Sequence, residues 1–164
     1  MAVKSIPVTL MTYEVMQAAL VGLMRQISSM KKNFNISHGL SKRNWDIDIE
    51  GACGEMAVAK ALNVYWDGSV DKFKSGGDIG SRLQVRTTTH PNGRLIVRDI
   101  DDESHIFLLV TGNAPEYILR GWTMGGEAKQ EKYLDSPAGR PPAYFVPISD
   151  LFEIENLKRQ IIND

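Results

Sequence analysis

One short apolar run limits the possible folds more than any other feature of the chain. Residues 106–110 read Ile-Phe-Leu-Leu-Val, without a polar side chain. Side chains of a strand alternate between its two faces, so a strand that is apolar at every position has to be covered on both faces. A chain of 164 residues is long enough to bury such a strand inside one domain. We therefore expect residues 1–164 to form a single domain around it.

Helical periodicity predicts what covers this strand. Between residues 12 and 30 apolar side chains recur every three or four positions, which predicts an amphipathic helix whose apolar stripe packs in the protein. The stripe comprises Val15, Met16, Ala19, Leu20, Leu23, Met24 and Ile27. A second helix is expected from about Asp48 to Leu62, and shorter helices at 125–133 and 150–162.

Further strand-like runs lie at 83–89, 94–98, 117–123 and 143–147. The first two are separated by His-Pro-Asn-Gly, which predicts a β-hairpin. Because helices precede and follow the strands, we expect an α/β fold with a mixed central β-sheet flanked by helices. The first helix and a loop at 31–45 would be additions to a core spanning residues 46–152.

Composition excludes several classes of protein. The chain is 43% apolar and 24% charged, which is ordinary for a globular protein. Cys53 is the only cysteine, which excludes an internal disulfide and a cysteine-rich zinc site and is typical of a reducing compartment. No apolar stretch resembles a signal peptide or reaches membrane-spanning length. We therefore expect a cytoplasmic protein without a membrane partner.

Positive charge gathers in the first part of the chain. Residues 1–100 hold 13 Lys and Arg against 9 Asp and Glu, whereas residues 101–164 hold 6 against 11. Any polyanion should therefore meet the first part. The loop at 31–45 interleaves basic with aromatic residues, a combination that can hold a phosphate backbone and stack on bases. A solvated surface loop explains the same residues equally well.

The helix expected at 48–62 carries one mid-helix acid among small residues. Gly51 and Gly54 each cost the helix about 1 kcal/mol relative to alanine, so the missing side chains should serve a close approach to a sheet. Helical spacing puts Glu55 on the stripe that faces this neighbour. A carboxylate placed there needs a cation, a metal or a hydrogen-bond donor as its partner.

A glycine-rich turn leads into the strand that begins at Leu83. Its glycines let the backbone turn sharply and place Asp78 just ahead of the strand. Within the strand, Gln84 and Arg86 project to one face while their neighbours enter the core. If the glycine-rich helix packs nearby, Glu55 reaches the same spot, and two carboxylates and an amide oxygen converge beside a cation.

Two interpretations of this cluster remain open. Hard oxygen ligands suit magnesium, and a bound divalent ion can activate water and neutralise charge on a phosphodiester. Arg86 could then hold the phosphate or stabilise the transition state, but a guanidinium does not act readily as a general base. Alternatively, Arg86 forms an ion pair with Glu55 or Asp78 that only fastens the helix to the sheet.

These residues also carry a resemblance. Gly-Asp at 77–78, a five-residue gap and Gln-Val-Arg at 84–86, with Glu55 on a preceding helix, resemble the PD-(D/E)xK nuclease superfamily, the restriction-endonuclease-like fold. Over roughly residues 45–152 the chain also resembles small phage-encoded proteins of that superfamily. In the family, an acid on the first core helix, an aspartate at the start of a strand and an acid-x-lysine on the strand surround one or two divalent metal ions.

The resemblance implies a metal-dependent nuclease that hydrolyses DNA, with magnesium or manganese as its cofactor. Glu55, Asp78 and Gln84 would be catalytic and metal-binding, Val85 would add its carbonyl as a ligand, and Arg86 would hold the lysine position. Gln84 stands where the family has an acid, and Arg86 where it has a lysine. The alternative is a module that keeps the fold but only binds nucleic acid or protein.

Basic residues are expected to contact the DNA backbone in a salt-dependent way. They are Lys31, Lys32, Lys42, Arg43, Arg82, Arg94 and Arg98. Small nucleases with one site per chain often need two copies to cut both strands, so a homodimer is one possible state of this chain. If the chain is phage-encoded, its place would be the cytoplasm of the host cell.

Overall fold

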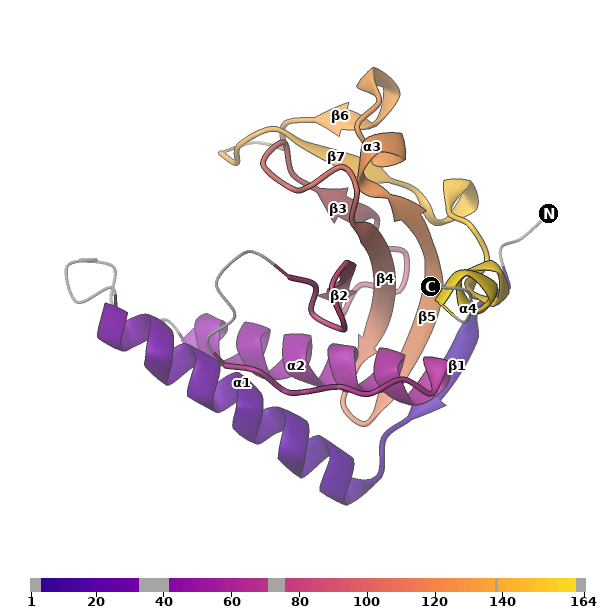
Figure 1. Cartoon of the computed structure of the whole chain (residues 1–164). Coiled ribbons are helices and arrows are strands. Elements are labelled where there is room, and N and C mark those ends of the chain that lie inside the picture. Colours follow the sequence, from indigo (N-terminus) through magenta and orange to yellow (C-terminus); the bar gives the residue numbers. More distant parts are fainter. Residues whose placement is uncertain (1–3, 33–41, 71–75, 138, 162–164) are drawn as a thin grey trace.

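The computed structural model describes residues 4–32, 42–70, 76–137 and 139–161. Its main sheet has four strands in the order β1-β5-β4-β2. These strands are β1 (Ile6–Thr9), β5 (Glu116–Met124), β4 (Ile106–Asn113) and β2 (Leu83–Thr88). β2 and β4 run parallel, and the other pairs are antiparallel. Figure 1 shows helices on one side of this curved sheet and a smaller sheet on the other, so the expected mixed sheet flanked by helices is confirmed.

The apolar run occupies the centre of this sheet. In β4, Leu108 and Val110 belong to a core that also contains residues of the helices, whereas Phe107 and Leu109 belong to a second core. The second core contains residues of the smaller sheet, which has the order β3-β7-β6 and consists of β3 (Leu95–Val97), β7 (Ala143–Val146) and β6 (Leu134–Asp135). β4 is therefore apolar on both faces because each face has its own core, as predicted.

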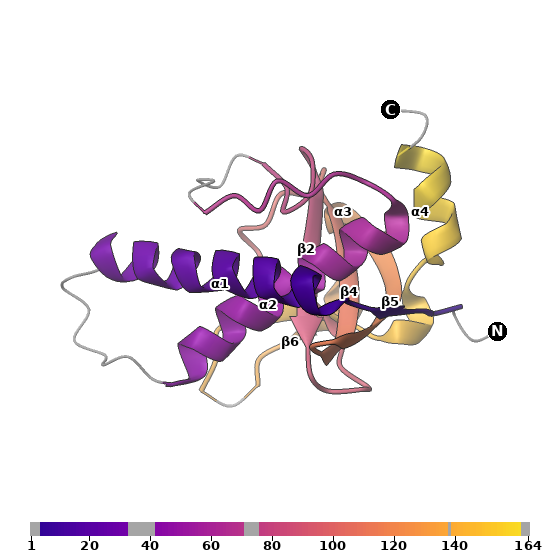
Figure 2. The same ribbon diagram turned by 90° about the horizontal axis from the view of Figure 1, so that it is seen from below.

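Two long helices, α1 (Thr12–Lys32) and α2 (Lys42–Leu62), form the layers below the sheet. Figure 2 shows α1 crossing α2 on the side away from the strands. The crossing is close because Gly22 has no side chain: a Cβ there would lie 2.6 Å from the carbonyl oxygen of Asp48. The buried residues of α1 are Ala18, Gly22 and Gln26, and none of them is one of its large apolar residues.

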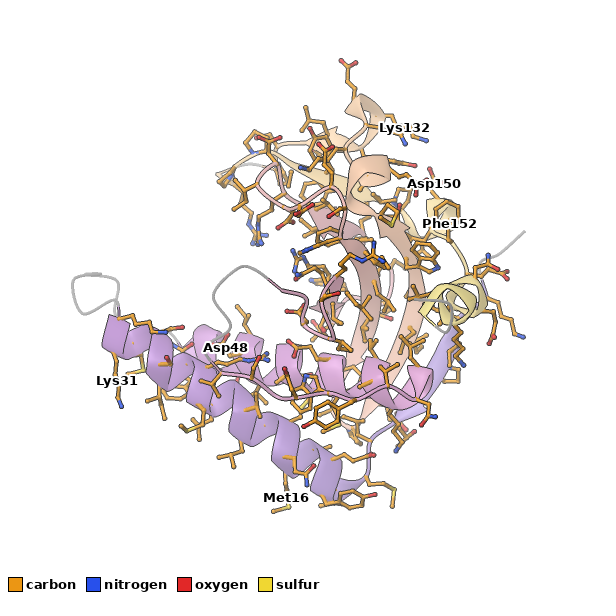
Figure 3. The ribbon with its side chains drawn as sticks, in the orientation of Figure 1. Met16, Lys31, Asp48, Lys132, Asp150 and Phe152 are labelled. Atoms are coloured by element: carbon orange, nitrogen blue, oxygen red, sulfur yellow. The ribbon has the colours of Figure 1, made fainter. Side chains whose placement is uncertain are left out.

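The prediction that the apolar stripe of α1 packs in the protein is confirmed for Val15, which packs against the core, and is wrong for three other members. Met16, Leu20 and Met24 are between 45% and 67% exposed. Figure 3 shows Met16 on the side of α1 that faces away from the rest of the molecule. Periodicity identified the helix, but the face that meets α2 is the one with Ala18 and Gly22.

The predicted hairpin between β2 and β3 is also wrong. The turn after β2 forms, with the Gly93 amide donating to the His90 carbonyl at 2.9 Å, but β3 then pairs with β7 in the smaller sheet. β4 takes one edge of β2. The Ile79 amide reaches the other edge and donates to the Leu83 carbonyl at 3.1 Å. The approach of this short segment fills the place that the hairpin partner would need.

Several boundaries differ from those expected. The loop predicted at 31–45 is shorter, because α1 continues to Lys32 and α2 begins at Lys42; residues 33–41 lie outside the described part. The helix expected at 125–133 divides into α3 (Gly125–Ala128) and a 3-10 turn (Glu131–Tyr133), and a second such turn (Ile148–Asp150) precedes α4 (Ile154–Ile161). β1 and β6 were not predicted. Within the described residues, none of the helices combines the length and apolarity needed to cross a membrane.

Candidate functional site

Asp78 is fixed at the edge of β2 that faces away from β4. One of its carboxylate oxygens accepts a hydrogen bond from the Val85 amide at 2.7 Å. The N–H and C=O of one strand residue point to the same side, so the Val85 carbonyl lies at this edge too, away from β4. The Ile79 hydrogen bond to Leu83, two residues earlier, follows the same geometry. The Asp78 carboxylate and the Val85 carbonyl are thus held together at the outer edge of β2.

Gln84 approaches the same place from the face of β2 opposite to α2. Its amide nitrogen donates to the Gly76 carbonyl at 3.1 Å and lies 3.3 Å from Nδ1 of His105. Leu83 and Val85, on the other face, are buried as the alternation predicts. A backbone carbonyl and a histidine ring therefore orient the Gln84 side chain.

Glu55 is almost fully buried and is held by a partner that the sequence did not suggest. The Arg25 guanidinium binds both of its carboxylate oxygens, with N–O distances of 2.7 and 2.9 Å. The indole nitrogen of Trp66 donates to the same carboxylate at 2.8 Å. Arg25 is itself fixed by a bond from its Nε to the Ser69 carbonyl at 2.9 Å. α1, α2 and the segment after α2 therefore meet in one buried network.

Burial raises the pKa of Glu55, and the nearby negative charge of Asp78 raises it further, while Arg25 and Trp66 oppose this shift. Burial alone would lower the pKa of Arg25, but Glu55, and more weakly Asp78 and Asp48, more than compensate for it. Arg25 therefore remains a cation. It lies among three carboxylates at the point where the sequence predicted a metal.

Arg86 points away from this network. Its guanidinium donates to the Asp101 carboxylate at 3.0 Å and to the Ile96 carbonyl at 3.3 Å, and it lies 5.1 Å from the centre of the Phe107 ring. The proposed structural pair of Arg86 with Glu55 or Asp78 is therefore not the one that forms. Arg86 joins β2 to the start of β4 instead.

A cleft of about 650 Å³ connects these parts. Its lining includes Asp78 and Gln84, whereas Glu55 and Arg86 are not part of it and lie behind Arg25 and Phe107, which are. Among its described lining residues are four aspartates, one arginine and one lysine: Asp48, Asp78, Asp101, Asp102, Arg25 and Lys32. With neutral histidine, the formal charge of the described lining as a whole is thus negative.

The donors around Asp78 suit a hard divalent cation only in part. Within the described residues, no group of three or more His, Cys, Asp or Glu side chains is arranged to hold a metal. Magnesium, however, often takes one or two carboxylates and completes its shell with other oxygens and water. The Asp78 carboxylate, the Gln84 side-chain oxygen and the Val85 carbonyl are the groups here that could supply such oxygens. Glu55 does not, because its carboxylate is bound by Arg25 and Trp66.

The basic residues predicted to bind DNA whose side chains the structure describes belong to several parts of the fold. Lys32 lines the cleft, and Figure 3 shows Lys31 near the same end of α1, on the side away from the sheet. Arg94 pairs with Asp135 across the smaller sheet, at 3.3 Å. Arg82 and Arg98 are exposed near the ends of β2 and β3. Lys42 and Arg43 begin α2, but their side chains lie outside the described part.

Sequence reasoning missed three residues of this site: Arg25, Asp101 and His105. Each is distant along the chain from the residue that it contacts, and no local pattern marks it. Arg25 in particular lies in a helix whose periodicity suggested only packing. Comparison of the chain with protein-family models, curated proteins and solved structures found no match.

Proposed function

We propose that the chain is a metal-dependent nuclease that hydrolyses phosphodiester bonds in DNA, with its reaction centre at Asp78 and Gln84. The observation that carries the proposal is the hydrogen bond between the Asp78 carboxylate and the Val85 amide. It fixes the Asp78 carboxylate at the strand edge that carries the Val85 carbonyl, and Asp78 and Gln84 both line the cleft. The arrangement matches what the PD-(D/E)xK pattern requires at the start of its strand, and it supports a restriction-endonuclease-like fold.

Magnesium or manganese would be held by Asp78, Gln84 and the Val85 carbonyl, with water in the remaining positions. Such an ion would lower the pKa of a bound water and neutralise charge on the phosphodiester. Glu55 would act as a ligand only after leaving Arg25. The negative lining gives an independent reason to expect a cation, because a phosphate would otherwise meet four aspartates in the same cleft.

The protein's own groups would orient the DNA. Arg86 keeps a positive charge close to the Gln84 side of the cleft, although Asp101 and Phe107 restrain it. Lys31, Lys32, Arg82 and the other predicted basic residues would contact phosphates outside the reaction centre. Contacts of that kind carry little sequence information, so we expect salt-sensitive binding with weak sequence preference.

The test is cleavage of supercoiled and single-stranded circular DNA with magnesium, manganese or a chelator. Asp78→Asn keeps the shape of the side chain and removes its charge, and we expect it to abolish metal-dependent cleavage. Asp99→Asn, an exposed aspartate that is not among the cleft residues, is the matched control. Magnesium should also raise the melting temperature of the wild type but not that of Asp78→Asn. DNA that stays intact with wild-type protein under all conditions would contradict the proposal.

The second candidate is a non-catalytic module that binds nucleic acid or protein. The bidentate bond between Arg25 and Glu55 favours it, because it occupies the carboxylate that the family pattern assigns to the metal. This candidate predicts salt-dependent binding of DNA, or capture of a protein partner, with no cleavage under any metal condition.

We further propose that two copies associate through the outer face of α1. Tyr13, Met16, Leu20 and Met24 form an exposed apolar stripe there, and with the half-buried Ile27 their spacing is symmetric about Leu20. Two antiparallel copies would therefore place like positions opposite each other. Sedimentation equilibrium should detect a dimer that Leu20→Glu disrupts and that Gln17→Glu, at an exposed neighbouring position, leaves intact. A wild type that is monomeric at all concentrations tested would refute it.

A cytoplasmic location is part of the proposal as well. The only cysteine, Cys53, is buried and free, and this suits a reducing compartment such as the cytoplasm of a host cell.

A further inference from the structure

One wall of the cleft is a single face of α1. Arg25, Ser28, Ser29 and Lys32 all line the cleft. They are spaced by three, four and seven positions from Arg25, which places them on the same side of the helix. α1 thus contributes a polar, positively charged wall, and its aspartate-rich counterpart lies at the starts of β2 and β4.

The geometry of Arg25 supplies the second observation. Its guanidinium donates hydrogen bonds to the Glu55 carboxylate and to the Ser69 carbonyl, and the Trp66 indole donates a hydrogen bond to Glu55. Among the described contacts, these bonds use one N–H on each of the three nitrogens, so two of the five N–H groups remain for a ligand. The Arg25 side chain is 22% exposed, against 7% for Glu55, so Arg25 is the member of the pair that the solvent in the cleft can reach.

An arginine held in this way is suited to bind phosphate. Its planar fork matches the oxygens of a phosphate, and a fork that is already immobilised loses less conformational entropy on binding than a free one. Burying an ion pair only for stability gains little over apolar packing. A ligand-binding role gives the protein a reason to keep the charges.

We propose that Arg25 binds a phosphate of the nucleic-acid strand, with Lys32 beside it on α1, and that Glu55 is a positioning residue for Arg25 rather than a metal ligand. The proposal rests on the function proposed above for its substrate class, and it gives that site a component from outside the predicted core at 46–152. A strand in the cleft would then lie between a phosphate-binding wall on α1 and the oxygen donors around Asp78.

The test measures binding of a fluorescent single-stranded oligonucleotide by anisotropy over a range of salt concentrations. Calcium replaces magnesium in the buffer, and the oligonucleotide is checked to remain intact. Because Arg25→Gln alone would leave the Glu55 carboxylate buried without its cation, the main variant is the double change Arg25→Gln and Glu55→Gln. It replaces the ion pair with two neutral amides, and its melting curve confirms folding.

We expect the double variant to fold, to bind the oligonucleotide at least tenfold more weakly and to lower the slope of log affinity against log salt by about 0.7, the value for one lost phosphate contact on a single strand. Arg25→Lys should keep the slope, because it keeps the charge, but lose affinity because it lacks the fork. Lys158→Gln removes a positive charge from α4, away from the cleft, and should change neither quantity.

A folded double variant that binds with wild-type affinity and slope would overturn the proposal and leave Arg25 a structural residue. Since binding is measured without cleavage, the two proposals fail separately. Arg25-dependent binding by a protein that never cuts DNA would refute the nuclease and keep the phosphate site. If the wild type cuts DNA with metal and the double variant binds the oligonucleotide as well as the wild type does, the nuclease is kept and the phosphate site is refuted. Wild-type protein that binds no oligonucleotide would overturn the phosphate site directly.

Discussion

Gly54 of α2 packs so closely against Thr87 of β2 that a Cβ atom on the glycine would overlap the threonine hydroxyl. This contact sets the distance between the helix and the edge strand of the main sheet. The next residue along α2 is Glu55, and the Thr87 strand carries Gln84 and Arg86. The spacing of the whole candidate site therefore depends on the absence of one side chain.

Replacing this glycine should destabilise the fold. Gly54→Ala improves helix propensity by about 1 kcal/mol but forces overpacking that costs about 1–3 kcal/mol, so we expect a net loss of up to about 2 kcal/mol in the free energy of unfolding. Gly51→Ala, three residues earlier, has open space for its Cβ and should stabilise by up to about 1 kcal/mol. Urea denaturation measures both. Equal effects of the two changes would show that helix propensity, not packing against Thr87, governs this helix.

The Thr87 hydroxyl should destabilise the fold. It is buried, and no group in the described part of the chain forms a hydrogen bond with it. We expect Thr87→Val to raise the free energy of unfolding by about 1 kcal/mol, because it removes an unsatisfied polar group. Thr111→Val is the comparison, and it should lower the free energy of unfolding, because the Thr111 hydroxyl accepts a hydrogen bond from Arg120 at 2.7 Å. A loss of stability in Thr87→Val would mean that the hydroxyl has a partner.

Stability should fall in alkaline solution because of Cys53. Burial raises the pKa of its thiol from 9.0 to about 11. The unfolded chain therefore loses this proton at lower pH than the folded chain, so the contribution of Cys53 to stability is complete below pH 9 and is lost as the pH rises to 11. The limiting slope is about 1.4 kcal/mol per pH unit.

Urea denaturation at pH 8, 9 and 10 checks this prediction, with Cys53→Ala as the control that lacks the ionisation. The difference in unfolding free energy between the two proteins should shrink with rising pH. A thiol reagent should also label native wild-type protein at pH 8 far more slowly than unfolded protein. Rapid labelling of the native state would contradict the burial of this thiol.

Arg86 should matter to the proposed cleavage through its charge. Arg86→Gln removes the cation beside the cleft, and we expect it to lower the rate of metal-dependent cleavage about 100-fold or more. Arg86→Lys keeps the charge but gives up the paired contacts with Asp101 and the Ile96 carbonyl, so it should stay within about tenfold of wild type. Single-turnover cleavage rates separate this effect from DNA binding. A fully active Arg86→Gln would exclude a role for the charge in cleavage.

Local patterns predicted the parts of the fold that local physics determines. An all-apolar run can only be a doubly covered strand, and β4 is one; interior glycines in a helix require a close neighbour, and Gly54 has Thr87. Gly51 is the counterexample, because nothing lies within 4 Å of the position of its missing Cβ. The same alternation correctly placed Gln84 and Arg86 on one face of their strand.

Choices between alternative partners could not be predicted in this way. The turn after β2 has hairpin sequence, but which strand pairs with β2 depends on the whole sheet. The stripe of α1 shows helical period, but period does not say which face meets α2. Arg25 and Glu55 are thirty residues apart, and only the crossing of two helices brings them together. For that reason the sequence alone allows a cation, a metal or a hydrogen-bond donor as the partner of Glu55.

The pairing of β1 with β5 has a consequence for synthesis. Ile6 lies opposite Leu119, so the first strand of the chain leaves the ribosome long before its neighbour exists. Arg25, Glu55, Asp78 and Gln84 are all made in that interval, yet the strand that pairs with β2 begins only at Ile106. A nascent chain therefore carries every proposed ligand before it can assemble them, and we expect any nuclease activity to appear only after β4 and β5 have left the ribosome.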